Sequence, residues 1–267
     1  MEKKRIEELA QDKRFISGIY NYCDRWCERC PQTSRCLNFA MGEEEFSDPE
    51  TRDIRNQAFW KKMEGVFRVT LEMLREKANE LGVDLDALDL KETAEQERLL
   101  SEAAGNHPVC REARVYVDMA EKWFDGAKAL FGSDDKEGSA PDPAGPSRES
   151  PERTDLEDAL EVARWYQHQI YVKLMRAVHG LLEEDSEPAE EICSYAKDSD
   201  GSAKVALIGI ERSIAAWGTI RNQFPYYDRE IVTLLAHLEA LMKKVDETFP
   251  NARGFLRPGF DEIRLNG

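Results

Sequence analysis

The sequence predicts an all-α protein: an antiparallel helical bundle of about five to six long helices, with an N-terminal four-cysteine metal-binding segment and a disordered central linker. Three observations lead to this prediction. Apolar residues recur at three- and four-residue steps over long stretches, which is the period of an α-helix. No stretch alternates apolar and polar residues between hairpin turns, as strands would. Four of the six cysteines fall within one short segment.

The expected helices begin and end at local signals. Ser47-Asp48-Pro49-Glu50 combines a capping side chain, a proline for the first turn and an acid near the positive end of the helix dipole. Thr154-Asp-Leu-Glu157 is typical of a capping box. We therefore expect a short helix within 83–105, a turn at 198–202, and long helices over 2–22, 47–82, 106–131, 154–182, 204–223 and 226–249.

A segment rich in proline, glycine and acids divides the chain. Residues 132–154 contain almost nothing apolar, so burial cannot offset the entropy of ordering them, and we predict a disordered linker. The predicted divisions are an N-terminal helix and cysteine segment, a first helical half, the linker, a second helical half and an irregular tail: 1–46, 47–131, 132–154, 155–250 and 251–267. We expect the two halves to pack as one bundle rather than as two domains, because each offers only two or three long helices.

Composition restricts the partners. The 267 residues are 41% hydrophobic and 34% charged, which is typical of a globular chain, and the net charge is -16. Such a charge repels phosphate backbones and anionic lipids, so we expect no nucleic acid and no membrane, and a protein partner instead. The start Met1-Glu-Lys-Lys-Arg5 carries no apolar signal segment, which favours a reducing cytoplasm. The sequence does not indicate the oligomeric state.

The cysteine segment predicts a metal site. Cys23, Cys27, Cys30 and Cys36 follow the spacing C-x3-C-x2-C-x5-C. Disulfides do not suit a reducing compartment, and free buried thiols are normally scattered through a core, as Cys110 is here. Metal coordination remains, because a cation offsets the repulsion among thiolates.

The sequence leaves two candidates for the metal centre, an iron–sulfur cluster and zinc. Zinc sites usually divide their ligands between two separated C-x2-C pairs. Here one segment supplies all four cysteines, and Pro31 follows Cys30 as in some ferredoxins. An iron–sulfur cluster is therefore slightly favoured over zinc.

The sequence offers a second candidate metal site within the bundle. Glu161, His168, Glu211 and His237 all stand among apolar residues on predicted helices, and ferritin-like bundles bind two metals through such side chains. The Glu-x-x-His pair of those proteins is absent. We therefore favour ordinary packing, with Glu211 paired to Arg164 or Arg221 and His237 bonded to a polar neighbour in the core.

Two functions follow from these sites. The first is a cytoplasmic metal-binding module that binds a partner or transfers electrons. The alternative is a redox enzyme, in which the cysteine centre passes electrons to the second Glu/His site. No phosphate-binding loop, dinucleotide fingerprint or Gly-x-Ser-x-Gly motif is present. The sequence leaves open whether the chain is an enzyme and which residues are catalytic.

Overall fold

The computed structural model describes residues 3–87, 90–127, 155–186 and 198–261. The all-α prediction is confirmed for these residues, which form helices and no strands. None of these helices is long and apolar enough to cross a membrane. The predicted linker, 132–154, lies outside the described residues.

The chain divides into two compact units. The first comprises Met1–Glu95 with Arg257–Gly267, and the second comprises Gln96–Leu256. The boundary falls within α5 (Leu90–Asn106) rather than at the predicted linker. The helices on either side of that linker, α6 (Pro108–Ala127) and α7 (Asp155–Ser186), belong to one unit and contact each other.

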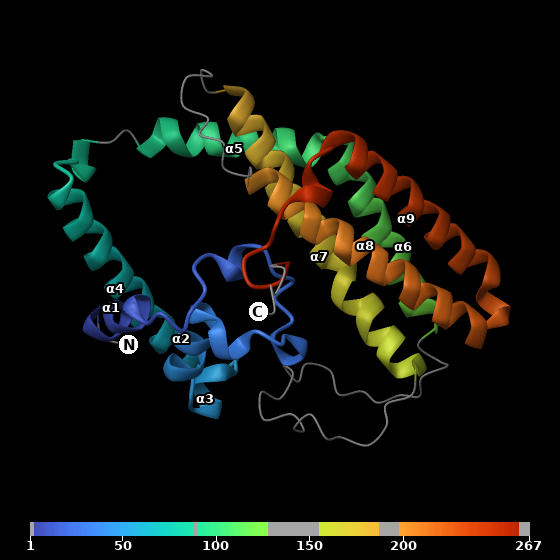
Figure 1. Cartoon of the computed structure of the whole chain (residues 1–267), viewed down its shortest axis with the longest axis horizontal. Helices are drawn as coiled ribbons and strands as arrows, with labels where there is room; N and C mark the ends of the chain where they lie inside the picture. Colours follow the sequence, from blue (N-terminus) through green and yellow to red (C-terminus); the bar gives the residue numbers. More distant parts are fainter. Residues whose placement is uncertain (1–2, 88–89, 128–154, 187–197, 262–267) are drawn as a thin grey trace, which may run out of the picture. The chain divides into compact units, whose positions relative to one another are not determined.

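Four helices form the body of the second unit. The helices α8 (Asp198–Gln223) and α9 (Asp228–Thr248) complete it, and consecutive helices run in opposite directions (Figure 1). The most extensive contact is between α7 and α8. There Gly209 of α8 lies so close to α7 that a Cβ atom would approach Tyr166 to 2.9 Å. The absence of a side chain therefore allows the two longest helices to approach each other.

The second unit buries a continuous aromatic and aliphatic core. Trp217 is completely buried; its ring contacts Trp123 edge to face at 4.9 Å, and its Nε1–H donates to the hydroxyl of Tyr116 at 3.0 Å. The core also contains Ile170, Leu174, Ile210, Ile220, Ile231, Leu234 and Leu238, all 1% exposed or less.

Apart from the long helix α4 (Gln57–Glu80), the first unit is built from short helices and loops. Its short α-helices are α1 (Lys3–Gln11), α2 (Leu37–Glu45) and α3 (Pro49–Arg52). Ion pairs join these helices: Arg5 to Glu44 at 2.8 Å and Lys62 to Glu45 at 3.1 Å. Apolar burial is small, and α4 buries only Ala78 among its described residues.

Two expected helices of the first unit are interrupted. The helix predicted over 2–22 ends at Gln11, because the side chain of Asp12 accepts a hydrogen bond from the Arg14 N–H at 2.9 Å and forms a turn instead. The helix predicted from 47 stops at Arg52. A new helix starts at Gln57, where the Asn56 side chain accepts from the Ala58 N–H at 2.9 Å.

Helices of the second unit agree more closely with the predicted ones. The turn predicted at 198–202 is wrong, because these residues form the first turns of α8. The other helices begin and end within a few residues of the predicted positions.

Candidate metal centre

The four cysteines lie on the loop that connects α1 with α2 in the first unit. Cys27 begins a one-turn 3₁₀ helix, Cys27–Arg29, and Cys36 directly precedes α2. A second such helix, Thr33–Arg35, lies between Cys30 and Cys36. Helical turns this short leave backbone groups and side chains facing the inside of the loop.

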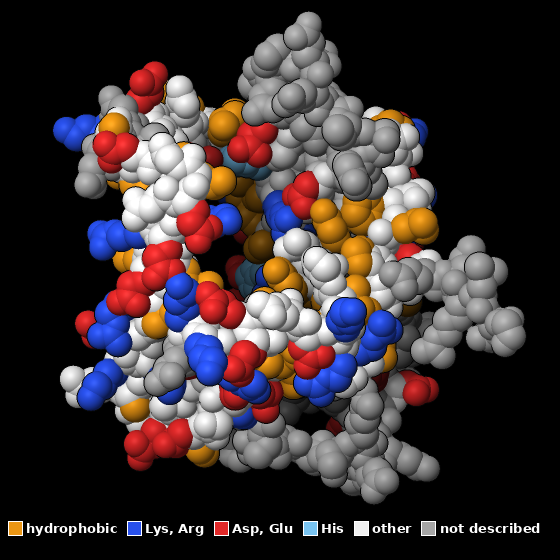
Figure 2. Space-filling view, turned by 60° about the vertical axis from the view of Figure 1, so that its left-hand side comes forward, with side chains coloured by type: hydrophobic (Ala, Val, Ile, Leu, Met, Phe, Trp, Pro, Cys, Tyr) orange, Lys and Arg blue, Asp and Glu red, His pale blue; other side chains and the backbone are white. Residues whose placement is uncertain are grey.

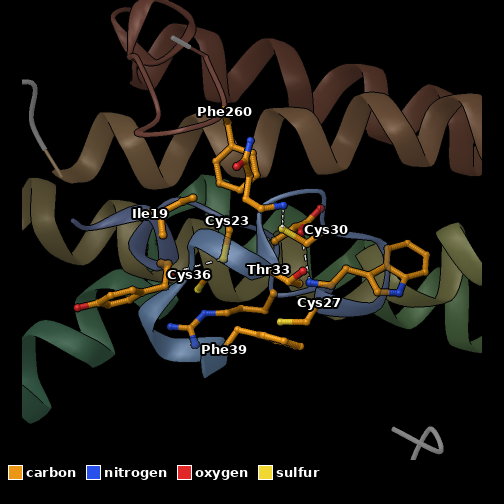
Figure 3. A pocket seen from close by; sticks show the side chains of 13 residues that line it. Ile19, Cys23, Cys27, Cys30, Thr33, Cys36, Phe39 and Phe260 are labelled. Atoms are coloured by element: carbon orange, nitrogen blue, oxygen red, sulfur yellow. Dashed lines mark hydrogen bonds between the residues drawn. The ribbon is translucent and has the colours of Figure 1, made fainter. Parts of the chain in front are cut away.

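All four cysteines line one pocket. Its cavity is about 20 Å³, and its wall also contains Ile19, Tyr20, Asp24, Arg25, Trp26, Gln32, Thr33, Phe39 and Phe260. Figure 3 shows the labelled cysteines between Phe260 on one side of the pocket and Phe39 on the other. Ile19 and Trp26 are buried, so much of the wall is apolar and excludes water.

A tight turn sets the spacing between Cys23 and Cys27. Arg25 adopts a left-handed conformation, with φ of 60°, and its carbonyl accepts from the Cys27 N–H at 3.0 Å. The Asp24 side chain accepts from the Trp26 N–H at 3.2 Å. The guanidinium of Arg29 lies over the Trp26 ring, 4.1 Å from its centroid. These contacts fix the path of the backbone between the first two cysteines.

Backbone groups contact two of the sulfur atoms. The Gln32 N–H donates to Cys30 Sγ at 3.4 Å, and the Cys23 thiol donates to the Tyr20 carbonyl at 3.5 Å (Figure 3). Hydrogen bonds from backbone N–H groups to cysteine sulfur stabilise negative charge on that sulfur, and in metal centres they tune the metal.

The C-terminal residues of the first unit close the pocket. The Gln32 side chain donates to the Gly259 carbonyl at 2.8 Å. Gly259 has a φ of 75°, and a Cβ atom there would lie 2.6 Å from Ile16 Cδ1. Only glycine fits this position without strain, and its neighbour Phe260 then reaches the pocket.

Two of the thiols, those of Cys27 and Cys30, resist ionisation in the absence of a cation. Burial, together with the nearby Cys23 and Glu28, raises the pKa of Cys27 to about 11. Burial also raises the pKa of Cys30, although the hydrogen bond from the Gln32 N–H opposes this. A positive ion in the pocket would offset both causes, since it attracts the thiolates that otherwise repel one another.

The sulfurs do not converge on one point. None of these cysteines forms a disulfide. Within the described residues, three ligand atoms lie within 4.8 Å of one another in the group Glu97, His179 and Glu183 of the second unit, and not among the cysteines. The cysteines therefore share a pocket while their sulfurs remain spread around it.

The structure does not bring the four residues of the expected Glu/His site together. The prediction that Glu211 points into the bundle is wrong, because its side chain is 49% exposed and pairs with Arg253 at 2.8 Å. That partner is neither Arg164 nor Arg221. Glu161 is half-buried on α7 and belongs to no convergent ligand group within the described helices.

The two histidines of that expected site lie in different surroundings. His168 is 61% exposed, and its Nε2 lies 3.7 Å from a Glu121 carboxylate oxygen. His237 is 16% exposed, and its Nε2 lies 2.8 Å from the Glu112 carbonyl oxygen. His237 therefore matches the alternative of a core histidine with a polar neighbour.

Sequence reasoning missed the Glu97, His179 and Glu183 group. His179 and Glu183 are four residues apart on α7, so the sequence places them on one face of a helix. Glu97 comes from α5, and no pattern in the sequence indicates that α5 passes beside this turn of α7. The i, i+4 spacing of His179 and Glu183 was a signal in the sequence. Glu97 could be recognised as the third member of the group only from the structure.

Comparisons of the chain with protein-family models, with curated proteins and with solved structures gave no match.

Proposed function

We propose that the first unit holds one metal centre through Cys23, Cys27, Cys30 and Cys36. The observation that carries the proposal is their common pocket, in which all four side chains from one short loop meet an apolar wall. Four thiols in one small pocket repel one another when they ionise. They do not form a hydrophobic core either. A bound cation explains the arrangement, because thiolate sulfur is a preferred ligand of zinc and iron.

An iron–sulfur cluster is the centre that we favour, with zinc as the alternative. A zinc ion binds each sulfur at about 2.3 Å, so tetrahedral ligands would lie about 3.8 Å apart. Here the sulfurs do not gather around a point, and a cluster of several irons accommodates ligands that are spread more widely. The cavity of about 20 Å³ is smaller than a cluster, so the cysteine side chains would turn outward on binding.

The role that fits this centre is to bind a partner or to transfer electrons. The protein that carries it is all-helical, and its second unit is a helical bundle. The first unit supplies the metal ligands, and the antiparallel helices α6 to α9 supply a stable body. Acidic and basic side chains are interspersed over the face shown in Figure 2, and the net charge of -16 favours a protein partner with a basic surface over nucleic acid or lipid. A reducing cytoplasm would keep the thiols available for the metal.

Metal analysis of protein purified without oxygen tests this proposal. We expect iron with acid-labile sulfide, or zinc, at about one centre per chain. Cys27→Ser and Cys30→Ser should each lower the metal content strongly. The matched control is Cys110→Ala, because Cys110 is fully buried in the second unit and lies outside the pocket. Absence of both metals, or equal metal in the Cys30→Ser and Cys110→Ala variants, would contradict the proposal.

A further inference from the structure

A second group of potential ligands lies in the second unit, between α5 and α7. His179 and Glu183 are one turn apart on α7, and Glu97 faces them from α5. His179 Nε2 lies 3.0 Å from Glu97 Oε1, and His179 Nδ1 lies 3.4 Å from Glu183 Oε2. One ligand atom from each residue lies within 4.8 Å of the others. Histidines and carboxylates at i, i+4 on a helix can reach a common ion.

The position of His179 Nε2 suits a ligand of an ion. This nitrogen is shielded from solvent and has no hydrogen-bond partner of acceptable geometry, although Glu97 Oε1 is only 3.0 Å away. The oxygen is near the nitrogen but not along the direction in which a ring N–H would point. Two ligands of one ion have this relation. At bond lengths of about 2.1 Å and angles of 90–110°, they lie about 3.0–3.4 Å apart.

The surroundings suit a cation. The open pocket beside these residues has a cavity of about 370 Å³ and is also lined by Ser101, Met175, Arg176, Gly180 and Asp198. Arg176 is the basic side chain in this lining, and it donates two hydrogen bonds to Asp198, of 3.1 and 2.7 Å. The carboxylates of Glu97 and Glu183 lie beside His179 in this lining, and the cavity has room for waters to complete the coordination of an ion.

We propose that Glu97, His179 and Glu183 bind one divalent first-row cation, such as Mn²⁺ or Zn²⁺, which links α5 to α7. A ligand set of two carboxylates and one imidazole suits these ions. The proposal is independent of the cysteine centre, because the two sets of ligands lie in different units. Its alternative is a protonated His179 that pairs with both carboxylates and binds no metal.

Titration of the full-length protein with Mn²⁺, followed by electron paramagnetic resonance of the free ion, tests the site. Mn²⁺ is the suitable probe because it prefers oxygen ligands such as carboxylates to thiolates, so the cysteines compete little. We expect about one bound Mn²⁺ per chain. His179→Ala and Glu183→Gln should abolish this binding. Glu97→Gln should do the same, and it is least able to disturb folding because the Glu97 side chain is 59% exposed.

The matched control is His168→Ala. His168 of α7 also lies beside a glutamate, Glu121 of α6, but within the described residues no third ligand joins this pair. This variant should keep the bound Mn²⁺. The proposal is overturned if the unmodified protein binds no Mn²⁺, or if Glu97→Gln binds it as tightly as His168→Ala does.

Discussion

The two units bury their apolar side chains to very different extents. In the second unit, four antiparallel helices enclose Trp217, Tyr116 and Tyr166, each 1% exposed or less. In the first unit, α4 leaves Trp60 and Phe67 more than half exposed. Burial of apolar surface is the main favourable contribution to folding, so the second unit can be stable from its core alone. The first unit depends more on its ion pairs and, as we propose, on a metal.

Removal of the metal should give the largest effect, confined to the first unit. Binding of structural zinc contributes about 10–16 kcal/mol to the folding of small zinc domains, and a unit with little core has few contacts to replace such a contribution. We expect amide hydrogen exchange in residues 12–45 to become fast after chelation. Exchange in α7, α8 and α9 should stay slow.

The control for this experiment is the Cys30→Ser protein under the same chelator. It should exchange fast in residues 12–45 from the start and should not change further. Equal protection of these residues with and without metal would show that the first unit folds without a cation. The two units would then differ in their composition but not in their source of stability.

Loss of a core side chain should give the next largest effect, in the second unit. Trp217→Ala removes a completely buried indole, its edge-to-face contact with Trp123 and the hydrogen bond to Tyr116. We expect a loss of about 3–5 kcal/mol in the free energy of unfolding, measured by urea denaturation. Trp60→Ala is the matched control, because this indole is 57% exposed and should cost about 1 kcal/mol or less. Similar costs for the two tryptophans would contradict the contrast between the units.

Sequence periodicity predicted the helices of the second unit better than those of the first. The apolar faces of α6, α7 and α9 are buried as their spacing indicates, because each packs against neighbouring helices along its length. In the first unit, Asp12 and Asn56 change the path of the chain through their own side chains. Such local hydrogen bonds compete with the helix, and a pattern of apolar residues does not report them.

The candidate sites show the same limit of prediction from a sequence pattern. The four cysteines were recognisable because one segment contains all of them, so the loop alone brings them to one pocket. The predicted inward placement of Glu211 was wrong because it assumed which side of α8 would face the core. Glu211 lies instead where the residues after α9 return toward α8, and its partner Arg253 is distant in sequence. The position of that returning segment depends on packing that the sequence pattern does not contain.

Substitution of Glu211 should give the smallest effect of the three. The Glu211 and Arg253 side chains are both about half exposed, at 49% and 50%, so solvent screens their attraction. Arg253 also donates two hydrogen bonds to Asp246, at 2.7 and 3.0 Å, and these would survive in Glu211→Gln. Hydrogen bonds to the carboxylate of Asp246 and, to a smaller extent, of Glu211 raise the pKa of Arg253. The charge of Arg253 therefore persists in the variant.

We therefore expect Glu211→Gln to lower the free energy of unfolding by about 0.5 kcal/mol or less, with metal content unchanged. Urea denaturation at low and high salt measures this, and the small difference should shrink as salt rises because the charges are exposed. Asp246→Asn is the companion variant and should cost more, since it weakens both hydrogen bonds to Arg253. A carboxylate buried inside the bundle would behave differently, because an unpaired or broken buried charge costs about 3–5 kcal/mol and salt hardly affects it. A cost of that size for Glu211→Gln would place the side chain inside the second unit and contradict the surface ion pair.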